Sequence, residues 1–488
     1  MSDALKVLFL SAEVVPFAKT GGLADVAGAL PGALKRLGVD VRVALPHYRM
    51  VKQGGFSTRL LLKALKVPLG TEILPADVLE TRTEDDVPVY LIDREDLYDR
   101  PGLYGNVAGD YYDNIERFSF FAHAALRLVE VLSFKPDLFH CHDWQSGLVP
   151  ALLKGPYRQS PVLRGAPSVF TIHNLGYQGI FPAEKLPITG LSWSEFFHPD
   201  GLEFWGKMSL LKGGVVYSEA ITTVSPTYAQ EIQTPEFGLG MEGILSHRSA
   251  SLHGILNGVD YHLWDPAIDS HLPERYFPGR MGGKQRCKES LIGEMGLDPS
   301  LKDRPLLGMT TRLATQKGLD LLVGVLDQVL GLNVGLVVLG SGEDRYQEAI
   351  QQAARENPGR VGLKLGFDEP LAHRIMAGVD LFLIPSRYEP CGLTQMYALK
   401  YGTVPIVRAT GGLEDTIVQF DSRTGQGNGI KFGPYDAKVF LAAIRQAVAR
   451  FEDKGRWRQL VLNGMKADFS WECSARKYLA LYQSLVTG

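Results

Sequence analysis

Two series of short apolar runs, separated by stretches with helical spacing, constrain the fold of this 488-residue chain more than any other feature. In the first series, an apolar run at residues 6–11 is followed by Gly21 and Gly22 and then by residues 23–37, where apolar side chains recur at helical intervals. Strands are also expected at 39–45, 137–140 and 168–172, and a helix at 115–132. The repeated strand, helix, strand order predicts a parallel sheet with helices on both faces.

A second series of the same kind begins near residue 252. Its expected strands are 252–256, 306–309, 335–339, 362–365, 381–384 and 404–407, and its expected helices are 319–330, 346–355, 371–377 and 393–401. The two series predict an α/β chain of two doubly wound, Rossmann-like domains, one of residues 1–251 and one of residues 252–469. A C-terminal helix at 470–488 is expected to rejoin the first domain, and residues 59–92 are expected to form an inserted hairpin.

Charge and cysteine content disfavour several classes of protein. With 51 Lys and Arg against 54 Asp and Glu, the net charge of −3 gives no global field that would hold nucleic acid or an anionic membrane. The four cysteines form no CxxC pair and no short metal-binding spacing, which favours a reducing, cytoplasmic compartment. The N-terminus lacks the basic region and cleavage site of a signal peptide, and no apolar run is long enough to span a bilayer.

Glycine is over-represented, with 53 residues where average usage of about 7% would give roughly 34. In Lys19-Thr-Gly-Gly-Leu-Ala-Asp25 a glycine pair directly precedes a helix, where backbone N–H groups and the helix dipole attract an anion, and Lys19 adds a full charge. The pattern fits phosphate binding, and it fits equally a tight turn with a solvated lysine. A similar segment, Thr410-Gly-Gly-Leu-Glu-Asp415, recurs in the second series through common structural purpose or through chance.

The segment Gly340-Ser-Gly342-Glu-Asp-Arg345 is the rival candidate for a nucleotide site. It follows an expected strand as the glycine fingerprint of nicotinamide-binding domains does, but Arg345 stands where the third glycine belongs. Glu343 and Asp344 would repel a pyrophosphate at the start of the helix. We therefore interpret this segment as a structural turn, and a dehydrogenase is disfavoured.

Two cations, Arg312 and Lys317, lie on the loop that joins an expected strand to the helix after Gly318. Arginine can chelate two oxygens in one plane and lysine acts as a point charge, so together they could stabilise a leaving diphosphate without a metal. Taken in isolation, two solvated loop cations are the simpler interpretation.

Histidines follow two of the expected strands. His140 and His142 would lie on the same face of one strand, but no third ligand is near them in the sequence, so hydrogen-bonded or packed histidines are favoured over a metal site. His173 directly follows the strand at 168–172, where open α/β sheets place ligand-binding groups. A satisfied histidine at the edge of the core is the alternative.

The most informative segment runs from Pro385 to Tyr397. Glu389 lies in a proline-rich turn directly after the strand at 381–384 and before a helix opened by Gly392. This order places a carboxylate at the carboxyl edge of the second sheet. Hydrolysis of glycosides uses a pair of carboxylates, so a lone Glu389 is better suited to binding sugar hydroxyls.

Together these motifs resemble the family of bacterial glycogen synthases and plant starch synthases, which are retaining glucosyltransferases that use ADP-glucose. The matching segments run in the expected order along the chain: Lys19 to Val26, His142-Asp-Trp144, His173-Asn174, Asn257-Gly-Val-Asp260, Arg312 with Gln316-Lys317-Gly318, Ser386 to Thr394, and Thr410-Gly-Gly412. The resemblance implies the GT-B architecture, in which two Rossmann-like domains face a cleft where donor and acceptor meet. It also implies transfer of glucose from ADP-glucose to the non-reducing end of glycogen or another α-1,4-glucan, with retention and release of ADP.

The resemblance also implies a set of residues at the reacting centre: Asp25, His173, Arg312, Lys317 and Glu389. Arg312 and Lys317 would bind the donor diphosphate, so no metal and no other cofactor is expected. His173 would contact the donor glucose, Glu389 would bind its hydroxyls, and Asp25 would organise the phosphate loop or the acceptor side.

Further residues are implied to bind substrate. In this group Lys19 and Gly22 would contact the donor phosphates, and Phe367 would stack on adenine. The other members are Gly21, Asn174, Asn257, Cys391, Gly392, Leu393, Thr394, Tyr397, Thr410 and Gly412.

One position departs from related transferases. Many retaining relatives carry a second glutamate where this chain has Tyr397. If that glutamate binds the nucleotide ribose in the relatives, this chain must bind the ribose with another group. Glycogen synthases also lack this second glutamate, so its absence points to that family among the retaining transferases. The competing interpretations are a transferase that uses UDP-glucose, a glucan phosphorylase, and a glucan-binding relative without catalysis.

Overall fold

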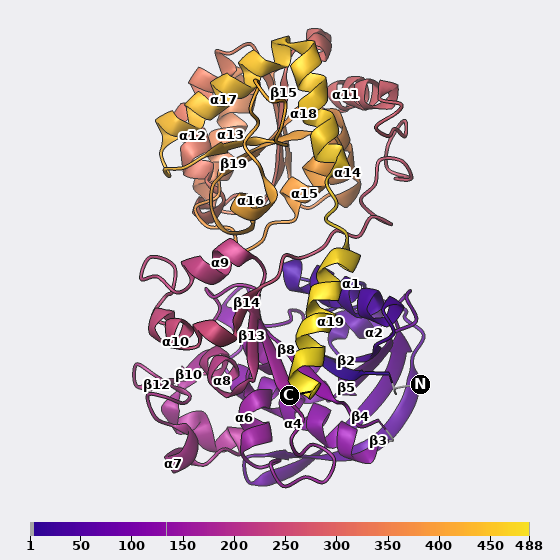
Figure 1. Cartoon of the computed structure of the whole chain (residues 1–488), viewed down its shortest axis with the longest axis vertical. Helices are drawn as coiled ribbons and strands as arrows, with labels where there is room; N and C mark the ends of the chain where they lie inside the picture. The colour runs from indigo at the N-terminus through magenta and orange to yellow at the C-terminus, as the bar shows by residue number, and fades with distance from the viewer. Residues whose placement is uncertain (1–3, 133, 488) are drawn as a thin grey trace. The chain divides into compact units, whose positions relative to one another are not determined.

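Figure 1 shows a computed structural model of the chain, which describes residues 4–132 and 134–487. The chain divides into two compact units: unit 1 is Met1–Gly258 with Trp471–Gly488, and unit 2 is Val259–Ser470. Each unit is built on a mainly parallel sheet, so the predicted α/β fold with two doubly wound domains is confirmed.

Unit 1 contains a nine-stranded sheet in the order β14-β13-β9-β8-β1-β2-β5-β4-β3. The strands from β14 to β5 pair in parallel, and β4 pairs antiparallel with both β5 and β3. The long β3–β4 pair is the hairpin that the sequence predicts at 59–92. The strands are β1 (Lys6–Leu10), β2 (Asp40–Pro46), β3 (Arg59–Leu69), β4 (Glu72–Arg82), β5 (Pro88–Asp93), β8 (Leu138–His142), β9 (Ser168–Ile172), β13 (Ala220–Thr223) and β14 (Leu252–Gly254).

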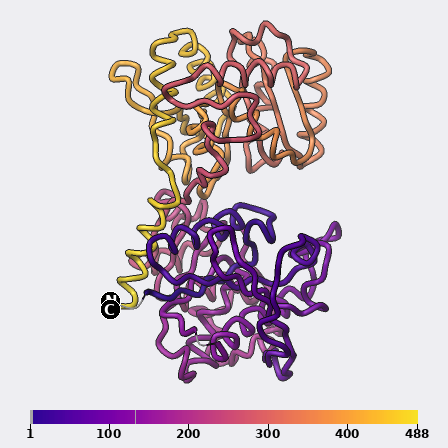
Figure 2. Tube along the Cα trace, turned by 90° about the vertical axis from the view of Figure 1, so that its right-hand side faces the viewer, coloured from indigo at the N-terminus to yellow at the C-terminus, as the bar shows by residue number. Residues whose placement is uncertain are grey.

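The helices of unit 1 include two long ones from opposite ends of the chain, α1 and α19, which contact each other. Figures 1 and 2 show the yellow C-terminal helix beside the indigo α1, so the C-terminal segment joins unit 1 as predicted. The helices are α1 (Gly22–Arg36), α2 (Arg49–Gln53), α3 (Glu95–Tyr98), α4 (Asn114–Val131), α5 (Asp143–Ser146), α6 (Leu148–Lys154), α7 (Trp193–Phe196), α8 (Leu210–Tyr217), α9 (Pro226–Glu231), α10 (Glu242–His247) and α19 (Trp471–Thr487). Short strands form two small sheets: β6 (Gly105–Asn106), β7 (Gly109–Asp110), β10 (Ile180–Pro182), β11 (Glu203–Phe204) and β12 (Lys207–Ser209).

The predicted domain boundary at residue 251 is wrong by a few residues. The strand expected to open the second series, β14, instead pairs in parallel with β13 at the edge of the first sheet, with Ile221 opposite Leu252. The boundary therefore follows Gly258. A three-residue edge strand carries too little pattern to show which sheet it joins, and β13 itself was not predicted.

Unit 2 contains a six-stranded parallel sheet in the order β17-β16-β15-β18-β19-β20. Its buried strands form one core with the surrounding helices, among which α12 contacts α13 and α17, and α11 contacts α14. The strands are β15 (Leu306–Thr310), β16 (Gly335–Gly340), β17 (Val361–Leu365), β18 (Leu381–Ile384), β19 (Val404–Arg408) and β20 (Ile430–Phe432). The helices are α11 (Gly282–Glu294), α12 (Leu319–Leu330), α13 (Asp344–Glu356), α14 (Glu369–Gly378), α15 (Thr394–Lys400), α16 (Gly411–Thr416), α17 (Ala437–Glu452) and α18 (Lys454–Lys466).

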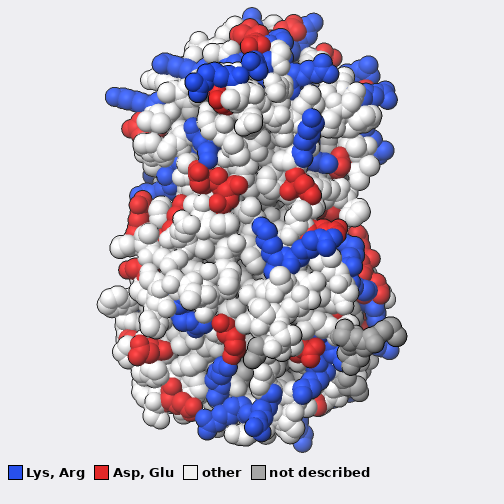
Figure 3. Space-filling model, viewed as in Figure 1, with Lys and Arg blue, Asp and Glu red and all other residues white. Residues whose placement is uncertain are grey.

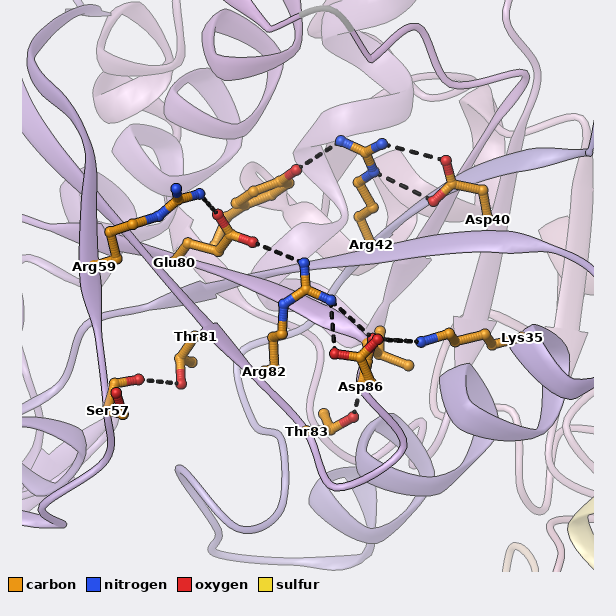
Figure 4. A network of polar contacts seen from close by, with 12 residues as sticks. Lys35, Asp40, Arg42, Ser57, Arg59, Glu80, Thr81, Arg82, Thr83 and Asp86 are labelled. Atoms are coloured by element: carbon orange, nitrogen blue, oxygen red, sulfur yellow. Dashed lines mark hydrogen bonds and ion pairs between the residues drawn. The ribbon is translucent and has the colours of Figure 1, made fainter.

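Charged side chains of both signs are distributed over the face seen in Figure 3, as the near-zero net charge leads one to expect. Within unit 1, a group of charged side chains forms a network that joins α1 to the neighbouring strands (Figure 4). Arg82 donates to both Glu80 and Asp86, and Lys35 near the end of α1 donates to the same Asp86. The network anchors the C-terminal end of α1.

Candidate functional site

Each sheet has one point at which the strand order reverses, and several of the expected site residues lie on the loops there. In unit 1 the reversal falls between β1 and β8, and in unit 2 it falls between β15 and β18. Open α/β sheets bind ligands at the carboxyl ends of the strands beside such a point. The loop after β1 carries Lys19, and the loops after β15 and β18 carry Lys317 and Glu389. Asp143, which the sequence did not single out as a site residue, directly follows β8 as the first residue of α5.

The glycine loop of unit 1 is organised by a buried carboxylate, Glu13. This carboxylate accepts hydrogen bonds from the backbone N–H of Thr20 at 2.5 Å and from the Thr20 hydroxyl at 2.6 Å. It also accepts from the backbone N–H of Gly21 at 3.1 Å and from the hydroxyl of Tyr104 at 2.7 Å. The sequence prediction missed Glu13, although an acidic residue that breaks the apolar run after the first strand was a usable signal.

The N-terminus of α1 is open. Gly21, its N-cap residue, has extended backbone with φ −152°, and no side chain caps the helix. A Cβ atom built on Gly21 or Gly22 would meet nothing within 4 Å. Beside this end, Nζ of Lys19 lies 2.7 Å from Oδ1 of Asp25, and both side chains are partly exposed. Unpaired helix N–H groups next to a mobile cation form a site that can bind an anion.

Buried histidines and an aspartate lie at the ends of β8 and β9. Nδ1 of His142 is 2.9 Å from Nε2 of His173, and Oδ1 of Asp143 accepts the backbone N–H of His173 at 2.7 Å. Burial raises the pKa of the Asp143 carboxyl to about 7, and burial lowers the pKa of His173 to about 3. His173 is therefore a neutral imidazole at physiological pH, able to bind a sugar hydroxyl but not to act as a cation.

The interpretation of His140 and His142 as hydrogen-bonded residues is confirmed. Nε2 of His140 lies 2.6 Å from the Thr171 hydroxyl, and Nδ1 lies 2.7 Å from the hydroxyl of Tyr482 in α19. Among residues 4–132 and 134–487, no group of three or more His, Cys, Asp or Glu side chains is placed to hold a metal ion.

The site residues of unit 2 centre on Glu389, a residue that is 8% exposed. Its Oε2 accepts a hydrogen bond from Nζ of Lys317 at 2.6 Å and one from the hydroxyl of Ser386 at 2.9 Å. Arg312 is exposed, and its guanidinium donates to Oε1 of Gln316 at 3.0 Å. The structure thus brings Lys317 and Glu389 into direct contact and leaves Arg312 accessible nearby on the same loop as Lys317.

Glycine allows the loops around Glu389 to touch. Gly318 has φ +76°, and a Cβ there would lie 2.1 Å from the carbonyl oxygen of Pro385. Gly411 has φ +45°, and a Cβ on Gly412 would lie 2.1 Å from the carbonyl oxygen of Cys391. The backbone N–H of Gly412 donates to the carbonyl of Glu389 at 3.2 Å. These glycines press two neighbouring loops against the segment 385–391.

The other expected residues of this segment shape the start of α15. Gly392 has φ +71°, and the Gln395 amide donates to the carbonyls of Cys391 and Gly392 at 3.0 and 2.9 Å. Leu393 is the N-cap residue of α15 and Thr394 is its first residue. Thr410, the N-cap residue of α16, is buried.

Tyr397 does not extend freely from α15. Its ring stacks on Trp264 with centroids 4.0 Å apart and planes 4° apart, and Trp264 also stacks on His373 with centroids 3.8 Å apart. Trp264 belongs to the irregular connection after the domain boundary, and the sequence gave no reason to single it out. The ring of Tyr397 is held in place, whether or not its hydroxyl serves the ribose.

The remaining expected residues lie in different surroundings. Phe367 is 85% exposed, as a ring that stacks on a ligand requires. Oδ1 of Asn174 accepts the backbone N–H of Gly176 at 2.9 Å. Asn257 is buried in unit 1, and its Oδ1 has no hydrogen-bond partner among the described residues.

The interpretation of Gly340 as part of a structural turn is confirmed. Gly340 has φ +155°, and a Cβ there would lie 1.8 Å from the carbonyl oxygen of Thr311. Glu343 caps the neighbouring loop, because its carboxylate accepts the backbone N–H of Thr315 at 2.9 Å. The space beside this glycine is filled by protein backbone.

Comparison with known proteins agrees with this arrangement. Residues 6–247 match the family described as starch synthase catalytic domain, and residues 298–459 match glycosyl transferases group 1. The chain is 48% identical over 487 residues to a glycogen synthase of Anaeromyxobacter dehalogenans (strain 2CP-C), covering 99% of this chain and 100% of that protein. It is 48% identical over 482 residues to a glycogen synthase of Anaeromyxobacter sp. (strain Fw109-5), covering 99% of both chains.

A solved structure is similar over the whole chain. The catalytic domain of starch synthase IV from Arabidopsis thaliana, bound to ADP and acarbose, superimposes with a TM-score of 0.91 at 35% identity, covering 99% of this chain and 100% of that one. In the part of the chain that the structure describes, no helix combines the length and apolarity needed to cross a bilayer.

Proposed function

The chain belongs to the glycogen and starch synthase family of glycosyltransferases, and from this premise we propose that it transfers glucose from ADP-glucose to the non-reducing end of an α-1,4-glucan. The family makes it a hexosyltransferase with glycogen synthase function. The observation that carries the choice of chemistry is the contact of 2.6 Å between Lys317 and a nearly buried Glu389 at the reversal point of the second sheet. A carboxylate for sugar hydroxyls and a cation for a departing phosphate lie side by side there.

Unit 2 supplies the groups for the nucleotide end of the donor. We propose that Lys317 and Arg312 stabilise the charge that develops on the leaving ADP, because fixed cations act most strongly where water is excluded. These cations would replace a divalent metal, so the proposed reaction needs none. Phe367, with its exposed ring, would stack on the base. The starch synthase IV structure that resembles this chain holds ADP, which supports a nucleoside diphosphate as the leaving group.

Unit 1 supplies a second group of ligands. The open N-terminus of α1 and Lys19 would bind phosphate oxygens, with Asp25 holding Lys19 in position until the ligand arrives. His173, neutral and beside the carboxyl end of β9, would donate a hydrogen bond to the transferred glucose. The relative from Arabidopsis also holds acarbose, which supports a glucan as acceptor.

Retention follows if acceptor and leaving phosphate share one face of the glucose. The bond from the anomeric carbon to the phosphate oxygen breaks, the bond to the acceptor 4-hydroxyl oxygen forms on the same side, and the acceptor proton passes to the departing phosphate oxygen. The balance is ADP plus a glucan longer by one residue. Glu389 would hold the sugar hydroxyls during this step, and Lys317 would stabilise the phosphate.

The donor is tested by incubating the purified protein and glycogen in EDTA with ADP-glucose or with UDP-glucose. Release of ADP in the chelator is the expected result. No release, or release of nucleotide from UDP-glucose alone, would contradict the donor assignment, and activity that appears only when a divalent ion is restored would contradict the role given to the cations.

We also propose a cytoplasmic location. The support is chemical: no disulfide joins any of Cys141, Cys287, Cys391 and Cys473, and of these four only Cys473 is exposed. Fractionation of the native cells, followed by detection of this chain, tests the location.

A further inference from the structure

The histidines at the ends of β8 and β9 form a chain of rings of which the proposed reaction uses only the last, His173. Nδ1 of His142 is 2.9 Å from Nε2 of His173, and the rings of His140 and His142 have centroids 4.1 Å apart. His140 is bonded in turn to the buried hydroxyl of Tyr482 in α19. The chain of rings therefore connects the C-terminal helix to the residue expected to contact the sugar.

These rings are neutral. Burial lowers the pKa of His173 to about 3 and lowers the pKa values of His140 and His142 well below the usual range. A neutral imidazole carries one N–H and one nitrogen that only accepts. The contact between His142 and His173 therefore contains one proton, and either ring can be the donor.

In the first arrangement His173 donates from Nε2 to Nδ1 of His142. The proton of His142 then lies on its Nε2, a buried atom with no hydrogen-bond partner among the described residues. A buried N–H without an acceptor is rare in folded proteins. In the second arrangement His142 donates from Nδ1, and its Nε2 carries only a lone pair, so no donor is orphaned.

The tautomer of His140, whose ring packs against His142, follows from the same reasoning. The Tyr482 hydroxyl is fully buried, and it is satisfied as a donor when it donates to Nδ1 of His140, 2.7 Å away. The proton of His140 then lies on Nε2 and is donated to the Thr171 hydroxyl at 2.6 Å. With both nitrogens paired, His140 offers a rigid surface against which the ring of His142 packs.

We propose that His142 is a positioning residue that fixes the tautomer of His173. By donating from its Nδ1 to Nε2 of His173, it leaves the proton of His173 on Nδ1. Among residues 4–132 and 134–487, no group is shown hydrogen-bonded to that Nδ1, so its N–H is available to a hydroxyl of the donor glucose. Asp143 fixes the backbone of His173 through a bond of 2.7 Å, and His142 fixes its ring. This inference rests on the proposed function only for the identity of the hydroxyl.

A pair of substitutions tests the role kinetically. His142→Phe keeps a ring of similar size but removes the donor, and kcat/KM for ADP-glucose should fall about tenfold to 100-fold, the effect of losing one well-placed donor. His142→Asn restores an amide donor near the position of Nδ1 and should recover most of that loss. Equal losses in both variants would overturn the proposal.

A matched control lies outside the chain of rings. His123 is a buried histidine whose nitrogens lie 2.9 Å from the Tyr157 hydroxyl and 3.0 Å from the Thr189 carbonyl. His123→Asn should lower the melting temperature without lowering kcat/KM. If it lowers kcat/KM as much as His142→Phe does, the kinetic effect reports general loss of structure, and the proposal fails.

Nitrogen NMR of protein labelled at the histidine rings reads the tautomer directly, without any substrate. The signals of His173 are identified by their absence in His173→Gln. In the wild type we expect a protonated Nδ1 and an unprotonated Nε2, and in His142→Phe a mixture of both tautomers. A wild-type His173 protonated at Nε2, or no change in His142→Phe, would overturn the inference. Protein that shows the expected tautomer but transfers no glucose would overturn the proposed function alone.

Discussion

Two glycine pairs with nearly the same sequence around them serve opposite purposes. Gly21 and Gly22 follow Thr20 at the start of α1, and Gly411 and Gly412 follow Thr410 at the start of α16. A Cβ on either glycine of the first pair would meet nothing within 4 Å, whereas a Cβ on Gly411 would lie 2.0 Å from the carbonyl oxygen of Glu389. The first pair keeps a helix end open, and the second brings backbone against backbone.

The comparison teaches that a glycine motif has no single meaning. In unit 1 the Glu13 carboxylate accepts the N–H groups of Thr20 and Gly21, and no side chain caps the helix that follows. In unit 2 the glycines shape the protein itself, because they let the segment around Glu389 lie against its neighbours. Substitutions in the two loops should therefore fail in different ways.

The largest effect is expected at Glu389, which the second glycine pair positions. Glu389→Ala should lower kcat for ADP-glucose by about 10²- to 10³-fold, because the hydroxyls of the donor glucose lose a hydrogen-bond acceptor and Lys317 loses its ion-pair partner. Steady-state kinetics measures the loss, and circular dichroism checks the fold. Glu414→Ala is the control, since Glu414 forms a comparable ion pair of 2.8 Å with Lys431 in the same unit. Near-normal turnover in Glu389→Ala would remove this residue from the mechanism.

The glycine pairs themselves are the next test. Gly412→Ala should lower the free energy of unfolding by about 1–3 kcal/mol, because its Cβ would lie 2.1 Å from the Cys391 carbonyl oxygen. Gly22→Ala should leave stability unchanged or raise it by up to about 1 kcal/mol, and should weaken donor binding by crowding the helix end. Denaturant unfolding and ADP titration separate the two effects. The different roles given to the two glycine pairs would be contradicted if Gly412→Ala is as stable as the wild type, or if Gly22→Ala binds ADP normally.

Lys19→Ala tests whether the positive charge beside the N-terminus of α1 contributes to binding of the donor. We expect KM for ADP-glucose to rise about tenfold with little change in melting temperature, because the Lys19–Asp25 pair is partly exposed and contributes little to stability. Lys154→Ala removes another partly exposed lysine of unit 1, paired with Glu219, and should leave KM unchanged. An unchanged KM in Lys19→Ala would refute phosphate binding at this loop.

The last prediction concerns the dependence of stability on pH. Burial raises the pKa of Asp143 from 3.8 to about 7, so between these values the folded protein binds more protons there than the unfolded chain does. Stability contributed by this group is therefore lost as pH rises from about 4 to 7, with a slope of at most about 1.4 kcal/mol per pH unit. The difference in unfolding free energy between wild type and Asp143→Asn should shift in favour of the variant over this range. A difference that does not depend on pH would contradict the raised pKa.

Much of the fold could be predicted because the strands of both sheets are buried apolar runs with clear interruptions. Those at 168–172 and 381–384 agree with β9 and β18 residue for residue. The failures were at one edge of the first sheet, where the edge strand β14 and its neighbour β13 are only three and four residues long. A short edge strand is defined by its neighbour and not by its own pattern, which is why the boundary was placed too early.

The site could be predicted where its residues lie on loops that follow neighbouring strands. Glu389 and Lys317 stand on loops that the strand order brings together, so their contact follows from the topology. Trp264 and Tyr482 could not be assigned, because their roles come from residues far away in the sequence. Glu13 was missed although its partners Thr20 and Gly21 lie only seven and eight positions away. Tyr482 is bonded to His140 across 342 positions.

Transfer of radiolabelled glucose from ADP-glucose to glycogen in EDTA tests the central claim most directly. The product is digested with an exo-acting enzyme that removes maltose from the non-reducing ends of α-1,4-glucans. We predict that ADP appears in equal amount to the incorporated glucose and that the digestion releases the label as maltose. Absence of incorporation, or label that resists the digestion, would contradict the proposed reaction.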